Sequence, residues 1–382
     1  MTNAPLAGVT VLSLEQAVAA PFATRQLADL GARVIKVERP EGDFARDYDT
    51  KVYGESSFFT WLNRGKESVV VDLKTADGIA LIRRIIRTAD VFVQNLAPGA
   101  VGRLGLDPLQ LHAEEPSLIA ASISGYGGGG PAEKKKAYDL LIQCEAGLVS
   151  VTGSPDAPAK VGISIADIAA GMYTYSGVLT ALYEREKTGA GQVFEVSMLE
   201  ALGEWMAQPY FYARYGGADP ARAGARHASI APYGPMACRD GTVFLGVQND
   251  REWAALCRDV LNRPDLAEDH RFVGNTGRMA HRQDLEDVLA AAFSGIRVDE
   301  AEARLDAAGI ANARLRTMQE FADHPQLEAR RRWRDIATRS GVVRATVPPV
   351  TVFGREPLMG PVPAIGEHSE QIRAEFGAGG SA

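Results

Sequence analysis

Asp167 occupies a position from which a carboxylate could act as a nucleophile. It begins a long helix expected from about Asp167 to Glu186, and the small residues Ala169, Ala170 and Gly171 follow it. Small neighbours would let the reacting carbon of a substrate approach the carboxylate. An acidic residue in the first turn of a helix is also common, because free N–H groups and the helix dipole stabilise it there. These residues alone leave both interpretations open.

Ser164 suggests a different chemistry. Gly162–Ala166 nearly matches the G-x-S-x-G turn of the α/β hydrolases, with Ala in place of the last Gly. A hydrolase triad would need a later histidine, and His227, His270 and His281 are candidates. A serine in a small-residue turn before a helix is the favoured interpretation. The six histidines show no metal-ligand spacing, so no metal site is predicted.

A glycine-rich segment, Gly125–Gly130, follows a predicted strand and matches G-x-G-x-x-G. Pro131 and the charged run Glu133–Lys136 stand where the helix of a dinucleotide site should begin. The turn after the first strand, Glu15–Pro21, also lacks the fingerprint. We therefore expect no NAD site, and interpret Gly127–Gly130 as a mobile loop that covers a ligand.

Basic residues follow the carboxyl ends of several predicted strands, where open α/β sheets bind ligands. They are Lys36, Arg39, Lys74, Arg103 and Lys134–Lys136. The chain has 41 Lys and Arg against 48 Asp and Glu, a net charge of −7. A local basic cluster on such a chain could form one polyanion site, and solvated surface charge is the alternative.

The composition limits which classes of protein the chain could belong to. The 382 residues are 46% hydrophobic and 23% charged, as in a globular protein of about two domains. The negative net charge disfavours nucleic acid and anionic membranes as partners. The three cysteines Cys144, Cys238 and Cys257 are too far apart for a disulfide framework, and no apolar run approaches the length of a membrane span. We expect a cytoplasmic protein.

The order of the expected elements predicts the fold. Short β-branched runs alternate with amphipathic stretches over the first 125 residues, which is typical of βαβ units with a mainly parallel sheet. The expected strands are Gly8–Leu14, Arg33–Glu38, Ser68–Asp72, Val91–Gln94, Leu118–Ser124, Phe194–Ser197 and Thr242–Val247. The expected helices include Pro21–Leu30, Asp77–Thr88, Tyr138–Leu148, Leu199–Tyr215, Arg251–Leu261, Arg282–Phe293 and Val298–Ala308.

A stretch rich in Gly, Ala, Pro and Arg, Gly216–Pro235, marks a change of domain. We predict an α/β protein with a Rossmann-like, parallel-sheet large domain of residues 1–215 and 326–382. Residues 216–325 are predicted to form a smaller α+β domain.

Motifs spread over nearly the whole chain resemble the class III CoA-transferase family, whose relatives include formyl-CoA transferases, carnitine CoA-transferases and acyl-CoA racemases. They are Pro5–Leu12, Leu30–Pro40, Gly42–Arg46, Asn63–Lys66, Val71–Lys74, Asn95–Ala100, Tyr138–Asp139 with Gly153, Lys187–Gln192 and Gly366–Ser369. The resemblance implies that Asp167 is the nucleophile and that a CoA thioester is the substrate, with no tightly bound cofactor. It also implies an interlocked homodimer.

The resemblance also implies which residues contact CoA. Val18 and Ala19 would line the pantetheine. The nucleotide end would contact Arg39, Val71, Asp72, Leu73, Lys74, Asn95, Leu96, Ala97 and Arg103, and Lys136, Ala137, Tyr138 and Asp139 complete the set. Several of these are the basic positions already identified at strand ends, and such a cluster would bind phosphates by charge-assisted hydrogen bonds.

Two positions depart from the family pattern. Val18 stands where formyl-CoA transferases carry a Gln that contacts the oxyanion, and Gln16 is a possible substitute. Tyr138 stands where the racemases carry a catalytic His, which argues against proton abstraction because a tyrosine is a poor base at neutral pH. A racemase or an acyl-CoA hydrolase on the same fold is the alternative function.

The acceptor is predicted from a later loop. Arg226–Gly234 resembles the corresponding loop of family members that use small dicarboxylates. Arg226 or His227 could pair with a second carboxylate, while a surface charge at a domain boundary is the alternative. We predict transfer of CoA from succinyl-CoA to a C4–C5 dicarboxylate such as mesaconate, itaconate or citramalate.

Overall fold

The computed structural model describes residues 4–377, which form two compact units. The first contains the chain up to Leu148, Val161–Gln208 and the residues from Gln326 on. The second contains Val149–Lys160 and Pro209–Pro325. The second unit therefore includes a short segment that precedes the predicted boundary at residue 216.

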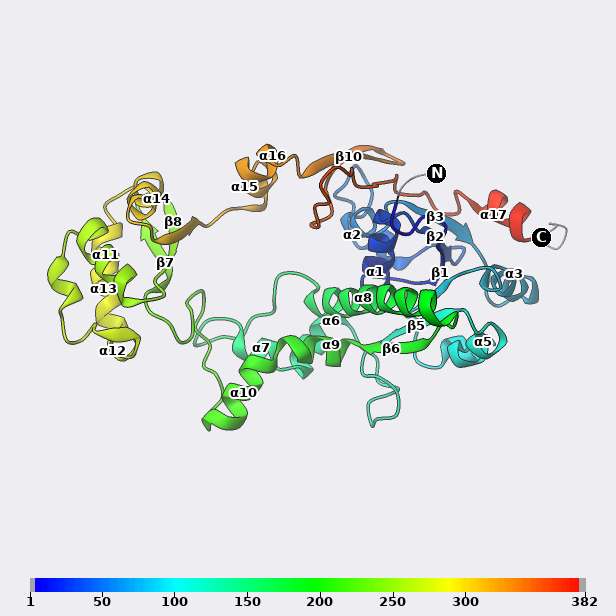
Figure 1. Ribbon diagram of the computed structural model, residues 1–382, viewed down its shortest axis with the longest axis horizontal. Helices are drawn as coiled ribbons and strands as arrows, with labels where there is room; N and C mark the ends of the chain where they lie inside the picture. Colours follow the sequence, from blue (N-terminus) through cyan, green and yellow to red (C-terminus); the bar gives the residue numbers. More distant parts are fainter. Residues whose placement is uncertain (1–3, 378–382) are drawn as a thin grey trace. The chain divides into compact units, whose positions relative to one another are not determined.

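Six parallel strands form the sheet of the first unit (Figure 1). They are β1 (Thr10–Leu14), β2 (Arg33–Glu38), β3 (Lys66–Val70), β4 (Val91–Gln94), β5 (Ile119–Ser124) and β6 (Val193–Ser197). Their order is β3-β2-β1-β4-β5-β6, so Leu12 of β1 lies between Ile35 of β2 and Phe92 of β4. The order reverses between β1 and β4, and ligands of open parallel sheets bind at the carboxyl ends of the strands beside such a reversal. The predicted parallel α/β architecture is confirmed.

Helices cover both faces of this sheet, which explains why its strands are apolar on both sides. One face packs against α1 (Ala19–Asp29), α6 (Asp139–Glu145), α8 (Ile165–Thr188) and α9 (Met198–Trp205). The other packs against α3 (Ala76–Ile86), α4 (Ala100–Arg103), α5 (Pro108–Glu114) and α17 (Ser369–Phe376). Along β1, Val11 therefore faces the first core and Leu12 the second.

The approach of α8 to α1 depends on a glycine. A Cβ atom on Gly171 would lie 2.7 Å from the carbonyl oxygen of Ala19 and 3.0 Å from a ring carbon of Phe22. The oxygen belongs to the backbone of α1 and cannot rotate away. Gly171 lies one turn after Asp167, so this contact also sets the depth of the first turns of α8.

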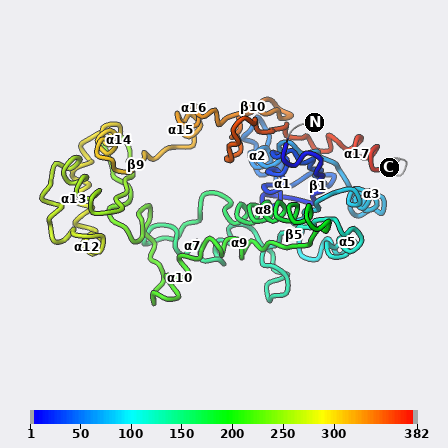
Figure 2. The backbone as a smooth tube through the Cα atoms, in the orientation of Figure 1, coloured from blue at the N-terminus to red at the C-terminus, as the bar shows by residue number. Residues whose placement is uncertain are grey.

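The C-terminal part of the chain returns to the first unit, as Figure 2 shows for its orange and red segments. It forms the antiparallel pair β10 (Trp333–Thr338) and β11 (Gly341–Thr346) and then α17. The ring Nδ1 of His368 accepts the N–H of Ser68, and Ser369 Oγ accepts the N–H of Val70. The late motif around these residues thus covers the edge strand β3.

Short elements complete the first unit, namely η1 (Phe44–Asp47), α2 (Ser57–Leu62) and α16 (Pro325–Ala329). The second unit contains an antiparallel sheet of β7 (Tyr233–Cys238), β8 (Gly241–Gly246) and β9 (Ala311–Arg314). Its helices are α7 (Leu148–Val151), α10 (Ala207–Gly216), α11 (Asp250–Ala255), η2 (Leu256–Val260), η3 (Pro264–Ala267), α12 (Gly274–Ala280), α13 (Arg282–Phe293), α14 (Val298–Ala307) and α15 (Met318–Ala322). The hydrophobic core of the second unit includes Trp253, Phe272 and Phe293.

The structure differs from the expected elements at several places. The helix predicted from Leu199 to Tyr215 is interrupted, because α9 ends at Trp205 and α10 begins at Ala207. Strands β7 and β9 were not predicted: β7 contains Gly234 and Pro235, which weaken a strand signal. Both are outer strands of their sheet, where a residue without an N–H is tolerated.

We expect Gly171→Ala to destabilise the first unit. The new methyl group would meet the Ala19 carbonyl, and such overpacking costs about 1–3 kcal/mol of unfolding free energy. Chemical denaturation would measure this loss. Gly203→Ala is the matched control, because Gly203 lies in α9 with no atom within 4 Å of the added Cβ. Equal stability of the two variants would contradict the close approach of α1 and α8.

Candidate active site

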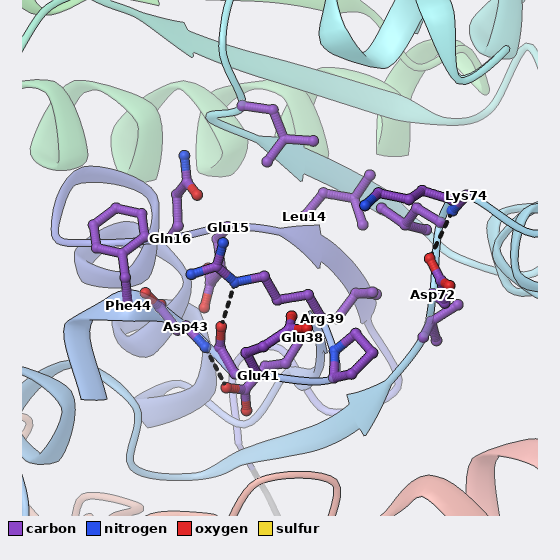
Figure 3. Close-up of a pocket in the computed structure, with 16 residues that line it drawn as sticks. Leu14, Glu15, Gln16, Glu38, Arg39, Glu41, Asp43, Phe44, Asp72 and Lys74 are labelled. Carbon is purple, nitrogen blue, oxygen red and sulfur yellow. Dashed lines mark hydrogen bonds between the residues drawn. The ribbon is translucent and has the colours of Figure 1, made fainter. Parts of the chain in front are cut away.

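A cavity of about 360 Å³ opens at the carboxyl ends of β1, β2 and β3 (Figure 3). It lies beside the point where the strand order reverses. Among the residues predicted to contact CoA, the cavity is lined by Arg39, Val71, Asp72, Leu73, Lys74 and Leu96. Gln16, the possible substitute for the missing Gln at position 18, also lines it. The fold therefore brings segments after four strands to one cavity.

The exposed cations of the cavity are suited to an anionic ligand. Figure 3 shows Lys74 and Asp72 on one side and Gln16 and Phe44 on the other. Arg39 and Lys74 are exposed, and the Nε of Arg39 donates to the carbonyl oxygen of Gly42 at 2.8 Å. Guanidinium and ammonium groups in such positions can donate charge-assisted hydrogen bonds to phosphate oxygens.

The turn after β1 is held by side chains from other strands. Asn95 Oδ1 accepts the N–H of Gln16, and Asn95 Nδ2 donates to the Gln16 carbonyl, both at 2.9 Å. Asn95, which follows β4, therefore holds the turn after β1 in place by hydrogen bonds between the two strands where the order reverses. Ala17 has a φ of +61°, a left-handed conformation uncommon for a residue with a side chain, and its N–H donates to Asp43. Val18 and Ala19, which follow, are buried.

Beneath this turn lies a buried charge cluster of Glu15, Lys36, Asp43 and Lys66. Lys66 Nζ lies 2.6 Å from Glu15 Oε1, and Lys36 Nζ lies 2.8 Å from Asp43 Oδ2 and 3.4 Å from Glu15 Oε1. The Lys36 side chain is 0% exposed. The expectation that Lys36 belongs to an exposed polyanion site is therefore wrong, because Lys36 is buried and forms ion pairs with the carboxylates of Glu15 and Asp43.

Burial and the partner charges shift the pKa values of these groups in opposite directions. Burial alone would raise the pKa of Glu15, but Lys66 and Lys36 outweigh it and lower that pKa to about 2. Burial lowers the pKa of Lys66 to about 7, even though Glu15 favours its charged form. For Lys36, burial is outweighed by Glu15 and Asp43, which raise its pKa.

Asp167 lies in the first turn of α8, half-buried. The N-cap residue Ser164 makes no capping hydrogen bond with its side chain. Instead, Asp139 Oδ1 accepts the N–H groups of Ala166, at 2.8 Å, and Asp167, at 3.4 Å. Burial and then the negative charge of Asp139 raise the pKa of Asp167 to about 7. The carboxylate is therefore a stronger base than an ordinary aspartate.

Tyr48, which sequence reasoning missed, interacts electrostatically with Asp167. Burial, followed by the charges of Asp43 and Asp167, raises the pKa of Tyr48 to about 12. Tyr48 thus connects Asp167 electrostatically with Asp43 of the buried charge cluster. Lys66 was also missed as a buried charge, because the predicted strand begins at Ser68 whereas β3 begins at Lys66.

The remaining predicted residues occupy several places. Arg103 ends α4 and is exposed, as are Ala97 and Lys136, whereas Ala137 is half-buried. Tyr138 is 66% exposed at the N-cap of α6. In the second unit, Arg226 forms a two-point ion pair with Glu286, at 2.6 and 3.0 Å, and the His227 ring stacks on Tyr233.

Neither a metal cluster nor a membrane-spanning helix occurs in residues 4–377. No group of three or more His, Cys, Asp or Glu side chains there could hold a metal ion. No helix there is both long and apolar enough to cross a bilayer.

Comparison with known proteins decides the family. The model of CoA-transferase family III matches residues 6–369. The chain belongs to CoA-transferase family III. A succinate–glutarate CoA-transferase of Agrobacterium fabrum is 33% identical, covering 97% of this chain and 96% of the relative. An acetyl-CoA:oxalate CoA-transferase of Acetobacter aceti is 36% identical, covering 98% and 96%.

A solved structure agrees with this assignment. The crystal structure of a CaiB/BaiF family protein from Brucella suis superposes with a TM-score of 0.88 at 33% identity, covering 98% of this chain and all of that one. The resemblance inferred from the motifs is thus confirmed, and the protein is a CoA-transferase. The NAD and serine-hydrolase interpretations of Gly125–Gly130 and Ser164 are set aside. After β5 the chain indeed forms turns and bends, and the next helix, α6, begins only at Asp139.

The CoA-transferase should become less stable as Asp167 ionises. An unfolded chain ionises this group near pH 4, whereas the folded protein keeps the proton until about pH 7. Stability is therefore lost as the pH rises between these values. We expect Asp167→Asn to melt several degrees above the parent protein at about pH 8 and near it at about pH 4.

Asp49→Asn is the control for this measurement. Hydrogen bonds from Ser57 and the Lys51 N–H lower the pKa of Asp49, so this substitution should cost stability above the pKa of the carboxyl. Thermal melts of both variants across this pH range would test the assignment. A gain for Asp167→Asn that does not depend on pH would contradict it.

Proposed function

We propose that the enzyme transfers CoA from succinyl-CoA to a C4–C5 dicarboxylate, such as mesaconate, itaconate or citramalate, with Asp167 as the nucleophile. The observation that carries this proposal is the Asp167 carboxylate itself, half-buried in the first turn of α8 with a raised pKa. Ala166, Ala169 and Ala170, which surround it in sequence, are fully buried and small. A substrate carbonyl can therefore approach without displacing large side chains.

The proposed reaction conserves an activated acyl bond at each step. Asp167 attacks the thioester carbonyl of succinyl-CoA, giving an aspartyl–succinyl anhydride and CoA thiolate. The thiolate attacks the Asp167 acyl carbon, giving an aspartyl-CoA thioester and releasing succinate. The acceptor carboxylate attacks that thioester, and the thiolate released then attacks the acceptor acyl carbon. The products are the new acyl-CoA and free Asp167.

A carboxylate suits this sequence better than a hydroxyl. An anhydride or thioester of Asp167 keeps the acyl group activated, whereas a serine ester would lose that activation. The raised pKa makes the ionised carboxylate a better nucleophile, and it sets the pH above which that form dominates. Water has to be excluded, and Gly127–Gly130 is the proposed lid.

CoA is proposed to bind with its nucleotide end in the cavity after β1, β2 and β3. Arg39 and Lys74 would contact phosphates there, with Arg103 and Lys136 as further cations. Val18 and Ala19, at the start of α1, would lie along the pantetheine. Binding energy from this long handle can position the distant thioester carbonyl. Gln16 is proposed to take the oxyanion contact that Val18 cannot make.

Two observations support a dicarboxylate acceptor. The relatives from Agrobacterium fabrum and Acetobacter aceti are named for the dicarboxylates succinate, glutarate and oxalate. The loop with Arg226 and His227 supplies groups that can bind a second carboxylate. Since Glu286 already pairs with Arg226, a substrate carboxylate would have to replace Glu286 or bind through His227.

We expect purified enzyme, given succinyl-CoA and a mixture of small carboxylic acids, to form a new CoA ester as succinate is released. Mass spectrometry of every CoA ester would identify the acceptor. Asp167→Asn should reduce exchange by at least about a thousand-fold while CoA still binds, because the attacking group is lost and the cavity is not. Ser164→Ala is the matched control and should remain active. Accumulation of free CoA alone would instead indicate hydrolysis.

We further propose that the enzyme is a homodimer, interlocked as in the family, and acts in the cytoplasm. Large apolar side chains are uncovered on both units. They include Leu140, Leu141, Tyr183 and Trp205 on the first and Tyr210, Phe211, Tyr212 and Tyr215 on the second, each 44–74% exposed. Clusters of this kind on a chain with three free cysteines are consistent with an interface in a reducing compartment.

Light scattering after size exclusion should give about twice the chain mass of 40.9 kDa. The mass should not change on dilution into the nanomolar range, because interlocked chains cannot separate without unfolding. A monomer mass would contradict the dimer, and a dilution-dependent mass would contradict interlocking.

A further inference from the structure

We propose that Asp139 and Gln143 of α6 are positioning residues that hold the first turn of α8, and with it Asp167, in the place required for attack. This inference rests on the proposed function of Asp167. It also gives a structural role to the side chain of Asp139, a residue expected to contact CoA. Both of its oxygens are already engaged by groups of the protein.

The two side chains form a continuous series of hydrogen bonds. Asp139 Oδ1 accepts the N–H groups of Ala166 and Asp167, and Asp139 Oδ2 accepts from Gln143 Nε2 at 2.7 Å. Gln143 Oε1 accepts the N–H of Val161 at 3.0 Å. Asp139 and Gln143 lie four residues apart, on the same side of α6, and Gln143 is fully buried. The series therefore connects α6 to both the entrance and the first turn of α8.

This connection stands where the chain re-enters the first unit. The chain leaves that unit at Leu148 and returns at Val161, which Gln143 binds. Ser164 offers no side-chain cap to α8, so Asp139 takes the place of a local N-cap. A carboxylate twenty-eight residues before the nucleophile thus replaces the usual neighbour in sequence.

Hydrogen-bond polarity makes the arrangement specific. An ionised Asp accepts with both oxygens, whereas an Asn has one oxygen and one NH₂ group. In Asp139→Asn, the NH₂ group must face either Gln143 Nε2 or the Ala166 N–H, and both are donors. If the Gln143 amide turned over, its NH₂ group would face the N–H of Val161, and these are again two donors. One unsatisfied donor pair remains in every orientation, so the first turn of α8 must shift.

The double variant Asp139→Asn/Gln143→Glu restores every partner. The oxygen of the introduced asparagine can accept from the Ala166 N–H, and its NH₂ group can donate to one oxygen of the introduced glutamate. The second oxygen of that glutamate can accept the N–H of Val161. The pair keeps one negative charge, which has moved one side chain away from Asp167. Such a double variant gives up the 3.5 Å contact between Gln143 Nε2 and the Ile163 carbonyl.

The test compares CoA exchange by the parent enzyme and these variants. Asp139→Asn should lower kcat by about ten- to a hundred-fold, the effect of a misplaced reacting group, with KM for succinyl-CoA within about two-fold. The double variant should recover most of kcat. Asp107→Asn is the matched control, because Asp107 also accepts backbone N–H groups, at the start of α5, and should leave both constants unchanged.

The pH profile distinguishes positioning from general stabilisation. Asp139 on α6 and Tyr48 after η1 interact electrostatically with Asp167. The Asp139 substitutions remove a negative charge from beside Asp167, whereas Asp107→Asn does not. The acid limb of the kcat profile should therefore move to lower pH in both Asp139 variants and stay in place for Asp107→Asn. A double variant that folds but does not recover kcat, or Asp139→Asn with kcat within two-fold of the parent, would overturn the inference.

A second readout does not require activity. If the parent enzyme exchanged no CoA, the proposed function would fail, but the coupling between the two sites could still be measured. The stability gained by Asp167→Asn should level off at a lower pH in the double-variant background than in the parent, and the midpoint of its pH dependence should move down, because only the pKa of the folded protein changes. An unchanged midpoint would overturn the coupling of Asp139 to Asp167, whatever the reaction.

Discussion

Neutralising two lysines inside the sheet is the constraint on which the site depends. Lys36 on β2 and Lys66 on β3 are buried, and each lies within hydrogen-bond distance of a carboxylate, Asp43 and Glu15 respectively. Removing one partner of such a pair leaves a buried charge unpaired, at a cost of about 3–5 kcal/mol. Asp43 also accepts the N–H of Ala17. The same charges that require neutralisation therefore determine the path of the turn beside the cavity.

Asp167 is connected to that turn through packing rather than through ion pairs. Gly171 allows α8 to approach the backbone of Ala19, at the start of α1. Asp139 of α6 holds the first turn of α8 in place by accepting two of its free N–H groups. Tyr48, which interacts with both Asp43 and Asp167, links the two arrangements electrostatically. The turn beside the cavity and the first turns of α8 thus depend on one set of contacts around α1 and α8.

Local sequence predicted the parallel sheet well, because its strands are buried on both faces and are therefore short apolar runs. The predicted Arg33–Glu38 and Val91–Gln94 strands match β2 and β4. Strand prediction failed where the local residue preferences disagree with the strand pairing in the folded protein. Strand β9, Ala311–Arg314, contains no β-branched or aromatic residue and exists because it pairs with β8.

The sequence by itself determined the family and the α/β class, because these follow from motifs and from local apolar patterns, and it predicted Asp167 as the nucleophile. Only the tertiary structure decided what the charged residues do. Lys36, expected as a strand-end cation for a polyanion, pairs with buried carboxylates, and the side chain of Asp139, a residue expected to contact CoA, accepts N–H groups of α8. Those partners, Glu15 for Lys36 and the Asp167 N–H for Asp139, lie 21 and 28 residues away in sequence. Strand order and helix packing bring such groups together, and electrostatic energy depends on their distance in space.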